Sequence, residues 1–273
     1  MLFFSMMDAM AKELATRHDP FQVVWARYVS QTFWAVLVLA PRLRRVMRTP
    51  YLGLQLLRSA LLFGATLCFF FAISLMGLAR AVAVFEITPL MLTAMAYFVL
   101  GEQVGLRRWA GVLIGFAGAL IIIRPGSEVF SFASLLPMGA AFCFASFSIA
   151  TRFLGERESP WTSFVYSTLL GSVIASAIVP FHWTTPAPAD AALMAAFGIF
   201  GGIGQLLLVL AFQHGRASAV APFSYVGLIF ATFWGWSIFA EIPGIWTVTG
   251  ALVIVGAGLY VWHREQRARR SPG

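Results

Sequence analysis

Charged residues are scarce in this chain. Asp, Glu, Lys and Arg make up 11% of its 273 residues, whereas 60% are hydrophobic. Soluble domains carry about a quarter charged residues, and the mean hydropathy of +0.83 lies far on the apolar side. The composition therefore excludes an ordinary soluble domain and predicts a chain that lies in a lipid bilayer.

Residues that carry enzyme or metal chemistry are also few. Cys68 and Cys143 are isolated within apolar stretches, which gives no basis for a disulfide or a metal site. The four His residues have no ligand spacing to one another. The sequence contains no Gly-rich loop ending in Lys-Ser/Thr, no Gly-x-Ser-x-Gly and no His-Glu-x-x-His. We therefore expect no enzyme, no catalytic residue, no cofactor and no metal.

Ten apolar segments follow one another along the chain. They cover residues 1–15, 22–40, 52–75, 80–100, 107–123, 131–151, 161–179, 190–213, 218–240 and 245–262. Their apolar character is continuous rather than alternating, which favours helices over barrel strands. The first segment is the weakest, because it is short and contains Asp8, Lys12 and Glu13. We expect an all-α membrane protein, and leave open whether the native chain begins before Met1.

Basic residues lie mainly on one side of the predicted membrane. The even-numbered connections and the C-terminus hold thirteen of the nineteen: Arg42, Arg44, Arg45, Arg48, Arg107, Arg108, Arg152, Arg157, Arg216, Arg264, Arg267, Arg269 and Arg270. The odd-numbered connections hold only Arg17, Arg80 and Arg124. Because basic loops stay in the cytoplasm, both termini are expected there. The net charge of +8 then needs no nucleic-acid partner.

Two stretches of the chain repeat one another. Residues 101–111 match residues 240–250, each with a Glu nine positions before a Gly, and 81–83 match 219–221. The pattern predicts two five-helix repeats, residues 1–124 and 131–263, followed by a basic tail at 264–273. With an odd number of spans each, the repeats must be inverted, which places Glu102 at the cytoplasmic face and Glu241 at the outer face. Such a duplication predicts a central cavity between the halves.

These features resemble the drug/metabolite transporter superfamily with EamA-type repeats. The resemblance is carried by residues 4–14, Arg27, Thr88-Pro89-Leu90 with Leu100-Gly101-Glu102, and Ala240-Glu241 with Gly250. Within the superfamily the chain is most similar to YddG-type exporters of aromatic amino acids. The resemblance implies ten helices, cytoplasmic termini, a central cavity and export of amino acids or related metabolites. One departure is Leu228, which occupies the repeat position of Pro89, so any backbone break associated with that proline should be absent from the second half or be made differently there.

Charged residues inside the spans are candidates for the cavity, because each unpaired charge costs roughly 2.5 to 3.5 kcal/mol near the midplane. Glu86, three residues before Pro89, either contacts a substrate or neutralises an Arg. Asp8 and Lys12 are one helical turn apart, and this spacing favours a structural pair. Arg27 either extends to the interface or holds a substrate carboxylate. Arg58 is expected to extend towards the cytoplasmic interface.

Aromatic and amide side chains complete the expected cavity wall. The full set of candidate substrate-binding residues is Glu86, Phe85, Pro89, Tyr97, Tyr225, Ser224, Gln205, Arg27, Asp8 and Trp234. An aromatic cavity with few polar groups would suit a flat amino-acid side chain. The alternative role of each aromatic ring is packing or lipid contact. The alternative role of the hydroxyl and amide side chains is to form hydrogen bonds between helices.

The sequence therefore predicts a secondary transporter of a bacterial-type inner membrane that exports aromatic or other neutral amino acids by alternating access. The expected partners are a small-molecule substrate and the lipid bilayer. A drug or metabolite exporter of the same superfamily is the first alternative. A non-transporting scaffold or lipid-handling protein, with a closed apolar cavity, is the second. The oligomeric state stays open, and the sequence is compatible with a monomer.

Overall fold

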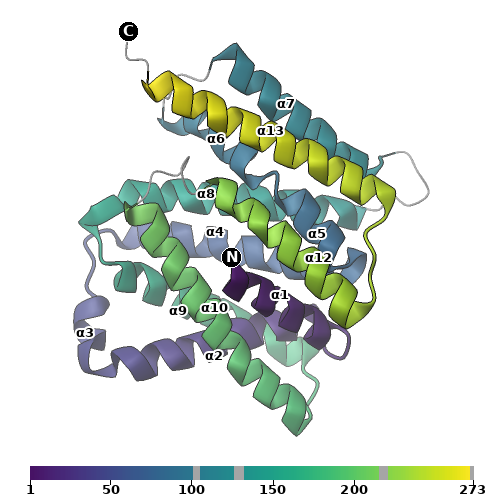
Figure 1. The fold of residues 1–273 in the computed structure, drawn as a ribbon. Coiled ribbons are helices and arrows are strands. Elements are labelled where there is room, and N and C mark those ends of the chain that lie inside the picture. The colour runs from purple at the N-terminus through teal and green to yellow at the C-terminus, as the bar shows by residue number, and fades with distance from the viewer. Residues whose placement is uncertain (101–104, 126–131, 215–220, 271–273) are drawn as a thin grey trace.

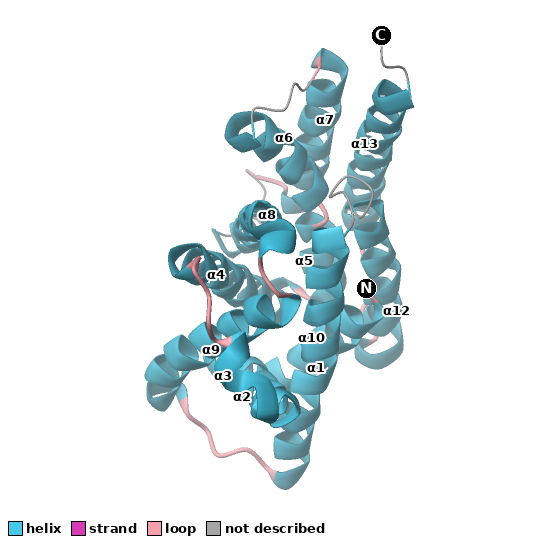
Figure 2. Cartoon of the chain, turned by 90° about the vertical axis from the view of Figure 1, so that its left-hand side faces the viewer, coloured by secondary structure: helices cyan, strands magenta, loops and turns pink. Residues whose placement is uncertain are grey.

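The computed structural model describes residues 1–100, 105–125, 132–214 and 221–270. All regular structure in these ranges is helical, and they contain no strand (Figures 1 and 2). The fold class is therefore all-α, as the composition predicts. Glu102 of the repeat pattern lies outside the described residues.

The helices follow the predicted apolar segments closely. In chain order they are α1 (Leu2–Ala15), α2 (Pro20–Leu39), α3 (Leu43–Val46), α4 (Leu52–Met76), α5 (Leu78–Phe85), α6 (Thr88–Leu100), α7 (Leu106–Ile123), α8 (Leu136–Leu154), α9 (Pro160–Ile178), α10 (Pro188–His214), α12 (Val226–Phe239) and α13 (Ile245–Arg270). Among the described residues, five short 3₁₀ helices accompany them, namely η1 (Ala40–Arg42), η2 (Phe132–Leu135), η3 (Gly155–Arg157), η4 (Val179–His182) and η5 (Ala221–Tyr225).

Most of these helices are long and apolar enough to cross a bilayer. Within the described ranges, seven candidate spans fall on α2, α4, α5 with α6, α8, α9, α10 and α13. Two shorter apolar helices coincide with α7 and α12. The 14 residues of α1 rise about 21 Å, less than the roughly 30 Å of a hydrocarbon core. The chain is thus a multi-pass membrane protein, and the grouping into ten spans in two inverted halves stays a prediction.

Helices from the two predicted halves pack against each other throughout the molecule. α4 packs on α8, α1 on α10, and α2 on both α9 and α10; α4 also packs on α9, α6 on α8, and α12 on α1. α7 and α13 lie side by side over most of their length (Figures 1 and 2). Neither predicted half therefore forms a separate bundle.

Glycines allow α7 and α13 to approach closely. A Cβ placed at Gly250 would lie 2.6 Å from the carbonyl oxygen of Gly118, and one at Gly118 would lie 3.0 Å from that of Gly250. Helices in lipid gain stability from such close packing rather than from the hydrophobic effect, because lipid tails are as apolar as leucine. The small residues of these two helices therefore serve packing.

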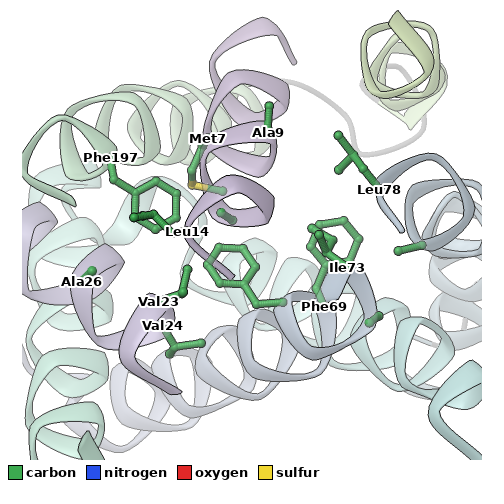
Figure 3. Close-up of a cluster of buried hydrophobic side chains, with 14 of the residues drawn as sticks. Met7, Ala9, Leu14, Val23, Val24, Ala26, Phe69, Ile73, Leu78 and Phe197 are labelled. Atoms are coloured by element: carbon green, nitrogen blue, oxygen red, sulfur yellow. The ribbon is translucent and has the colours of Figure 1, made fainter. Parts of the chain in front are cut away.

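The larger core cluster surrounds α1 (Figure 3). Met7 and Leu14 of α1 meet Val23 of α2, Phe69 of α4 and Phe197 of α10, and all five side chains are buried. A helix too short to span the bilayer is therefore held by its neighbours in the middle of the bundle.

Polar contacts hold together the odd-numbered connections, which contain few arginines, at one end of the bundle. Asp190 accepts a hydrogen bond from Arg17 and lies 3.1 Å from the ring of His18, which joins the α1–α2 connection to α10. Lys12 forms an ion pair with Glu241, which joins α1 to the α12–α13 connection. The charge pattern predicts that this end faces outwards, and we call it the outer end. The opposite end, where Thr49 donates to Glu158, is called the inner end.

The prediction for Arg58 is wrong. Its side chain does not extend to the interface but is completely buried. It donates to the carbonyl oxygen of Ser163, to the hydroxyl of Ser167 at 2.8 Å and to that of Thr151 at 3.3 Å. The guanidinium also lies 5.0 Å from the ring centre of Phe147. α8 and α9 thus supply polar groups within the bundle that the sequence of α4 alone does not reveal.

Candidate functional site

The helix break at Glu86 and Ile87 is the centre of the site. α5 ends at Phe85 and α6 begins at Thr88. Pro89 has no N–H to donate to the carbonyl of Phe85, four residues before it. The hydroxyl of Thr88 donates to that carbonyl instead, at 2.5 Å. The carbonyl that proline leaves without its helical partner is therefore satisfied within the chain.

Glu86 faces the second half of the chain from this break. Its side chain is buried, and its Oε2 accepts a hydrogen bond from the hydroxyl of Ser224 at 2.7 Å. Ser224 belongs to η5, the 3₁₀ turn that precedes α12. In the predicted repeat, the 138-residue offset between the stretches 81–83 and 219–221 pairs Glu86 with Ser224, whereas the 139-residue offset of Pro89 and Leu228 pairs it with Tyr225. Glu86 thus contacts a residue at or next to its predicted counterpart, and the contact joins a carboxylate to a hydroxyl.

A cavity of about 140 Å³ lies beside this contact. Its wall is mostly apolar and draws on α1, α2, α4, α5, α6, α8, α10, η5 and α12. The charged and polar residues of the wall are Asp8, Arg27, Glu86, Ser5, Thr66, Thr88, Ser148 and Ser224. Four phenylalanines complete it, at positions 4, 69, 85 and 144. A largely apolar wall with a few convergent polar groups is typical of a small-molecule site.

The phenylalanine rings form one continuous group along the cavity. The ring of Phe85 lies 4.8 Å from that of Phe69 and 5.5 Å from that of Phe144, measured between centres. Such tilted and edge-on arrangements are the favoured ones for aromatic pairs. They give the wall flat apolar surfaces contributed by α4, α5 and α8.

Arg27 brings a positive charge to the cavity wall. It is 5% exposed, which excludes the interfacial position and supports the cavity position among the two alternatives. One of its terminal nitrogens donates to the hydroxyl of Thr66 at 2.7 Å. The guanidinium lies 5.3 Å from the ring centre of Tyr28 and 5.6 Å from that of Phe70. Since a guanidinium has five N–H donors, this contact leaves others for a ligand.

Asp8 lines the same cavity from α1, but its expected pair with Lys12 is wrong. Lys12 instead forms an ion pair with Glu241, and its ammonium lies 4.6 Å from the ring centre of Phe239. Glu241 of the α12–α13 connection lies within reach of Lys12. The spacing of residues along α1 cannot indicate such a distant partner. α1 therefore links the cavity, through Asp8, to the outer end, through Lys12.

The charges in the cavity are unequal in number. Asp8 and Glu86 carry two carboxylates and Arg27 carries one guanidinium, so the wall has a formal charge of −1 when all three are ionised. In a low-dielectric surrounding, such charges act over longer distances than in water. In that fully ionised state, the charge balance of the wall would favour a ligand with a positive group.

Four predicted site residues do not belong to the wall of the cavity as described. Gln205 accepts a hydrogen bond from Gln31 at 2.8 Å and so connects α10 to α2. The indole N–H of Trp234 donates to the hydroxyl of Ser5 at 3.2 Å. Tyr97 is 43% exposed, with its ring against Phe98 and Trp109.

Tyr225 is the fourth of these residues. It is buried in a cluster formed mainly by α5, α6, α7, α8 and α13, where its hydroxyl lies close to Gly258. Its neighbour in sequence, Ser224, lines the cavity instead. Within η5, consecutive residues therefore point to different surroundings.

Several wall residues were not predicted from the sequence. Thr66, Ser148 and three phenylalanines, Phe4, Phe69 and Phe144, line the cavity without having been candidates. The two hydroxyl residues offered a weak signal, because each interrupts an apolar run. The phenylalanines offered none, since the chain contains 26 of them and their orientation depends on helix packing.

A multi-pass helical bundle with a partly charged internal cavity is the architecture of a membrane transporter. The chain belongs to the EamA-like transporter family, whose model matches residues 1–124 and 131–262. This family lies within the drug/metabolite transporter superfamily and is a family of transporters rather than enzymes. Its members named below handle small metabolites.

Three relatives match nearly the whole chain. An S-adenosylmethionine uptake transporter of Rickettsia bellii (strain RML369-C) is 29% identical over 265 residues, covering 96% of this chain and 90% of the relative. A riboflavin transporter of Vibrio cholerae is 31% identical over 251 residues, covering 86% and 82%. The pseudopaline exporter CntI of Pseudomonas aeruginosa is 27% identical over 258 residues, covering 93% and 90%. These relatives include both uptake and export proteins.

A solved crystal structure has the same fold. It superposes with a TM-score of 0.71, covers 97% of both chains and is 19% identical in sequence. At this level of identity the likeness concerns the fold alone.

Proposed function

We propose that the chain is a secondary transporter for small organic metabolites that combine a positively charged group with a flat apolar part. The observation that carries the proposal is the joint placement of Asp8, Arg27 and Glu86 in an aromatic-lined cavity next to a helix break. Charged residues inside a membrane bundle are costly and commonly mark a substrate path. A helix interrupted near the middle of the membrane is a frequent part of transporter sites.

The proposed mechanism is alternating access between two inverted halves. Under the proposed symmetry, the helices of the two predicted halves correspond in order: α1 to α8, α2 to α9, α4 to α10, α6 to α12 and α7 to α13. Under this correspondence the contact of α4 with α8 becomes that of α10 with α1, and the contact of α6 with α8 becomes that of α12 with α1. The pairs α2 with α9 and α7 with α13 exchange with themselves. This packing pattern supports a pseudo-two-fold axis, about which the halves can interchange conformations.

The proposed substrate carries an α-amino acid group. Its ammonium would lie near Glu86 or Asp8, and its carboxylate would accept from Arg27 in the forked geometry that guanidinium groups favour. Its flat part would pack against the rings of Phe69 and Phe85. Aromatic amino acids fit this description. S-adenosylmethionine fits it too, because it adds a positive sulfonium centre, which the second carboxylate would balance, and a flat adenine.

The alternatives differ in what they require of the cavity. A drug or metabolite exporter of the same superfamily could use the same charged groups, and substrate tests decide between it and the proposal. A scaffold or lipid-handling protein would need a closed apolar cavity, which the three charged wall residues disfavour. We propose an inner-membrane location with both termini in the cytoplasm, supported by the distribution of arginines.

Transport by purified protein in liposomes tests the proposal. Labelled phenylalanine and labelled S-adenosylmethionine are followed across the membrane of vesicles containing the native chain, Glu86→Gln or Glu13→Gln. We expect the native chain to move at least one of the two above empty vesicles. Glu86→Gln should lower the rate about ten-fold or more, as expected for loss of a desolvated charge contact. Glu13, which pairs with the exposed Arg17, is the matched control and should leave the rate unchanged.

The same vesicles, loaded on one side or the other, show whether the protein moves these compounds in both directions. Absence of transport of both compounds, with the protein folded, would reject the proposed substrate class. An unchanged rate in Glu86→Gln would remove this carboxylate from the mechanism.

A further inference from the structure

The connection between α2 and α4 concentrates positive charge at the inner end. Between Asp19 and Glu86 the sequence contains no acidic residue. Within that stretch the connection holds four arginines, which we call the connection arginines: Arg42, Arg44, Arg45 and Arg48. They belong to η1, α3 and the residues that follow, at the edge of the bundle (Figures 1 and 2). None of the four lines the central cavity, so the transport site does not explain them.

The connection arginines lack the counter-charges that other cations of the chain have. All four are exposed, and within the part of the chain that the structure describes no ion pair or side-chain hydrogen bond engages them. Arg17 and Lys12 at the outer end, by contrast, each contact a carboxylate. The carboxylate that contacts this connection is that of Glu158, which accepts from Thr49. Even with it counted, four guanidinium groups and one carboxylate leave a formal charge of +3.

Contacts with α9 fix the backbone of the connection. α3 packs on α9, and the hydroxyl of Tyr166 in α9 donates to the carbonyl of Met47 at 2.9 Å. Leu43 and Val46 are three residues apart, a spacing that places them on one face of a helix, and both are partly buried. The arginines beside them are exposed. The connection therefore presents its arginines from a positioned backbone.

Apolar side chains exposed on both sides of the connection indicate that it lies next to lipid. Leu37 and Val38 in the last turn of α2 and Leu57 in the second turn of α4 are each more than half exposed. Both helices are candidate membrane spans, so these side chains meet hydrocarbon. Arginines that follow directly on such a surface lie at the depth of the lipid headgroups.

We propose that the connection between α2 and α4 binds the headgroup of an anionic phospholipid in the leaflet around the inner end. Guanidinium groups donate paired hydrogen bonds to phosphate oxygens, and the acyl chains would lie along the exposed apolar side chains of α2 and α4. Anionic leaflets attract basic segments next to membrane spans. The proposal is independent of the transported substrate, because the connection shares no residue with the described cavity wall.

Hydrogen exchange of the full chain in lipid nanodiscs tests the site. Nanodiscs of phosphatidylcholine are compared with nanodiscs in which phosphatidylglycerol replaces a rising fraction of that lipid, and mass spectrometry follows residues 42–49. We expect phosphatidylglycerol to slow exchange there about three-fold or more, because a bound headgroup stabilises the closed backbone. The α9–α10 connection at the outer end is the internal reference and should change little.

The double variant Arg44→Gln, Arg45→Gln should lose most of this slowing. Its matched control, Arg157→Gln, Arg264→Gln, removes the same charge from η3 and from α13 and should keep it. Thermal unfolding in phosphatidylcholine verifies that both variants are folded, as expected because Arg44 and Arg45 are exposed.

Three outcomes overturn the proposal. The first is the absence of slowing by phosphatidylglycerol. The second is an equal slowing in the double variant, or an equal loss in the control, which would indicate a general effect of charge at the inner end. The third is an equal slowing by inorganic phosphate in phosphatidylcholine nanodiscs at constant ionic strength, which would identify a free anion instead of a lipid.

Discussion

Arg58 illustrates how a charged residue can lie inside the bundle for a structural reason. Its hydrogen-bond acceptors have other partners: the hydroxyl of Ser167 donates to the carbonyl of Ser163, and that of Thr151 donates to the carbonyl of Phe147. Removing the guanidinium therefore leaves few polar groups unsatisfied. A buried charge replaced by an apolar side chain of similar size is often tolerated.

We expect Arg58→Met to unfold at nearly the native temperature and Arg58→Ala to unfold several degrees lower. Methionine fills most of the space of the arginine stem, whereas alanine leaves a cavity costing about 2 to 5 kcal/mol when a large side chain is lost. Thermal unfolding in detergent, followed by circular dichroism, measures both. Equal losses in the two variants would show that the charge, rather than the packing, stabilises α4 against α8 and α9.

At the scale of elements, α1 connects the cavity to the outer end. Asp8 lines the cavity, and one turn later Lys12 pairs with Glu241 of the α12–α13 connection. The carboxylate of Glu241 also lies beside Gly77 at the start of α5, where φ is +86° and a Cβ would lie 3.1 Å from both carboxylate oxygens. Helix α1, the α4–α5 junction and the α12–α13 connection therefore meet at one ion pair.

Breaking this pair should loosen the end of α1. We expect Lys12→Gln and Glu241→Gln each to increase amide hydrogen exchange in residues 9–15, measured by mass spectrometry. The double variant should exchange no faster than either single variant, because both changes remove the same contact. The reversed pair Lys12→Glu, Glu241→Lys should recover part of the protection. Additive effects in the double variant would contradict a direct pairing.

The contact between α7 and α13 gives a prediction with a control on the same helix. Gly250→Val should lower the yield and thermal stability of folded protein, because a Cβ there would meet Ile122 and the carbonyl of Gly118. Gly256→Val is the matched control, since nothing lies within 4 Å of a Cβ at that position. Similar losses for both variants would indicate a general effect of valine in α13 rather than of helix packing.

Sequence reasoning located the helices well and the cavity in part, for physical reasons. Apolar runs define helices in lipid, so segment positions could be read directly. Asp8, Arg27 and Glu86, which line the cavity, stood out in the sequence because charges are rare in such runs. Tyr225 and Gln205 lie outside the cavity wall, because the rotation of a helix about its axis depends on its neighbours. The partner of Lys12 was missed because Glu241 is distant in sequence.

At the scale of the whole molecule, the prediction that matters most is the opposite orientation of the two halves. Leu106 and Ile245 are the first residues of α7 and α13, they match under the 139-residue offset, and they are 88% and 71% exposed. Inverted repeats place them on opposite sides of the membrane, and parallel repeats would place them on the same side.

Cysteine labelling distinguishes these arrangements. Cys68 and Cys143 are first replaced by alanine, and a single cysteine is then introduced as Leu106→Cys or Ile245→Cys. Intact cells are treated with a maleimide that does not cross the membrane, and permeabilised cells serve as the positive control for each site. We expect labelling at position 245 in intact cells and at position 106 only after permeabilisation, because the arginine-rich connections are predicted to lie in the cytoplasm. Labelling of both positions in intact cells would remove the inverted symmetry, and with it the proposed exchange of conformations between the halves.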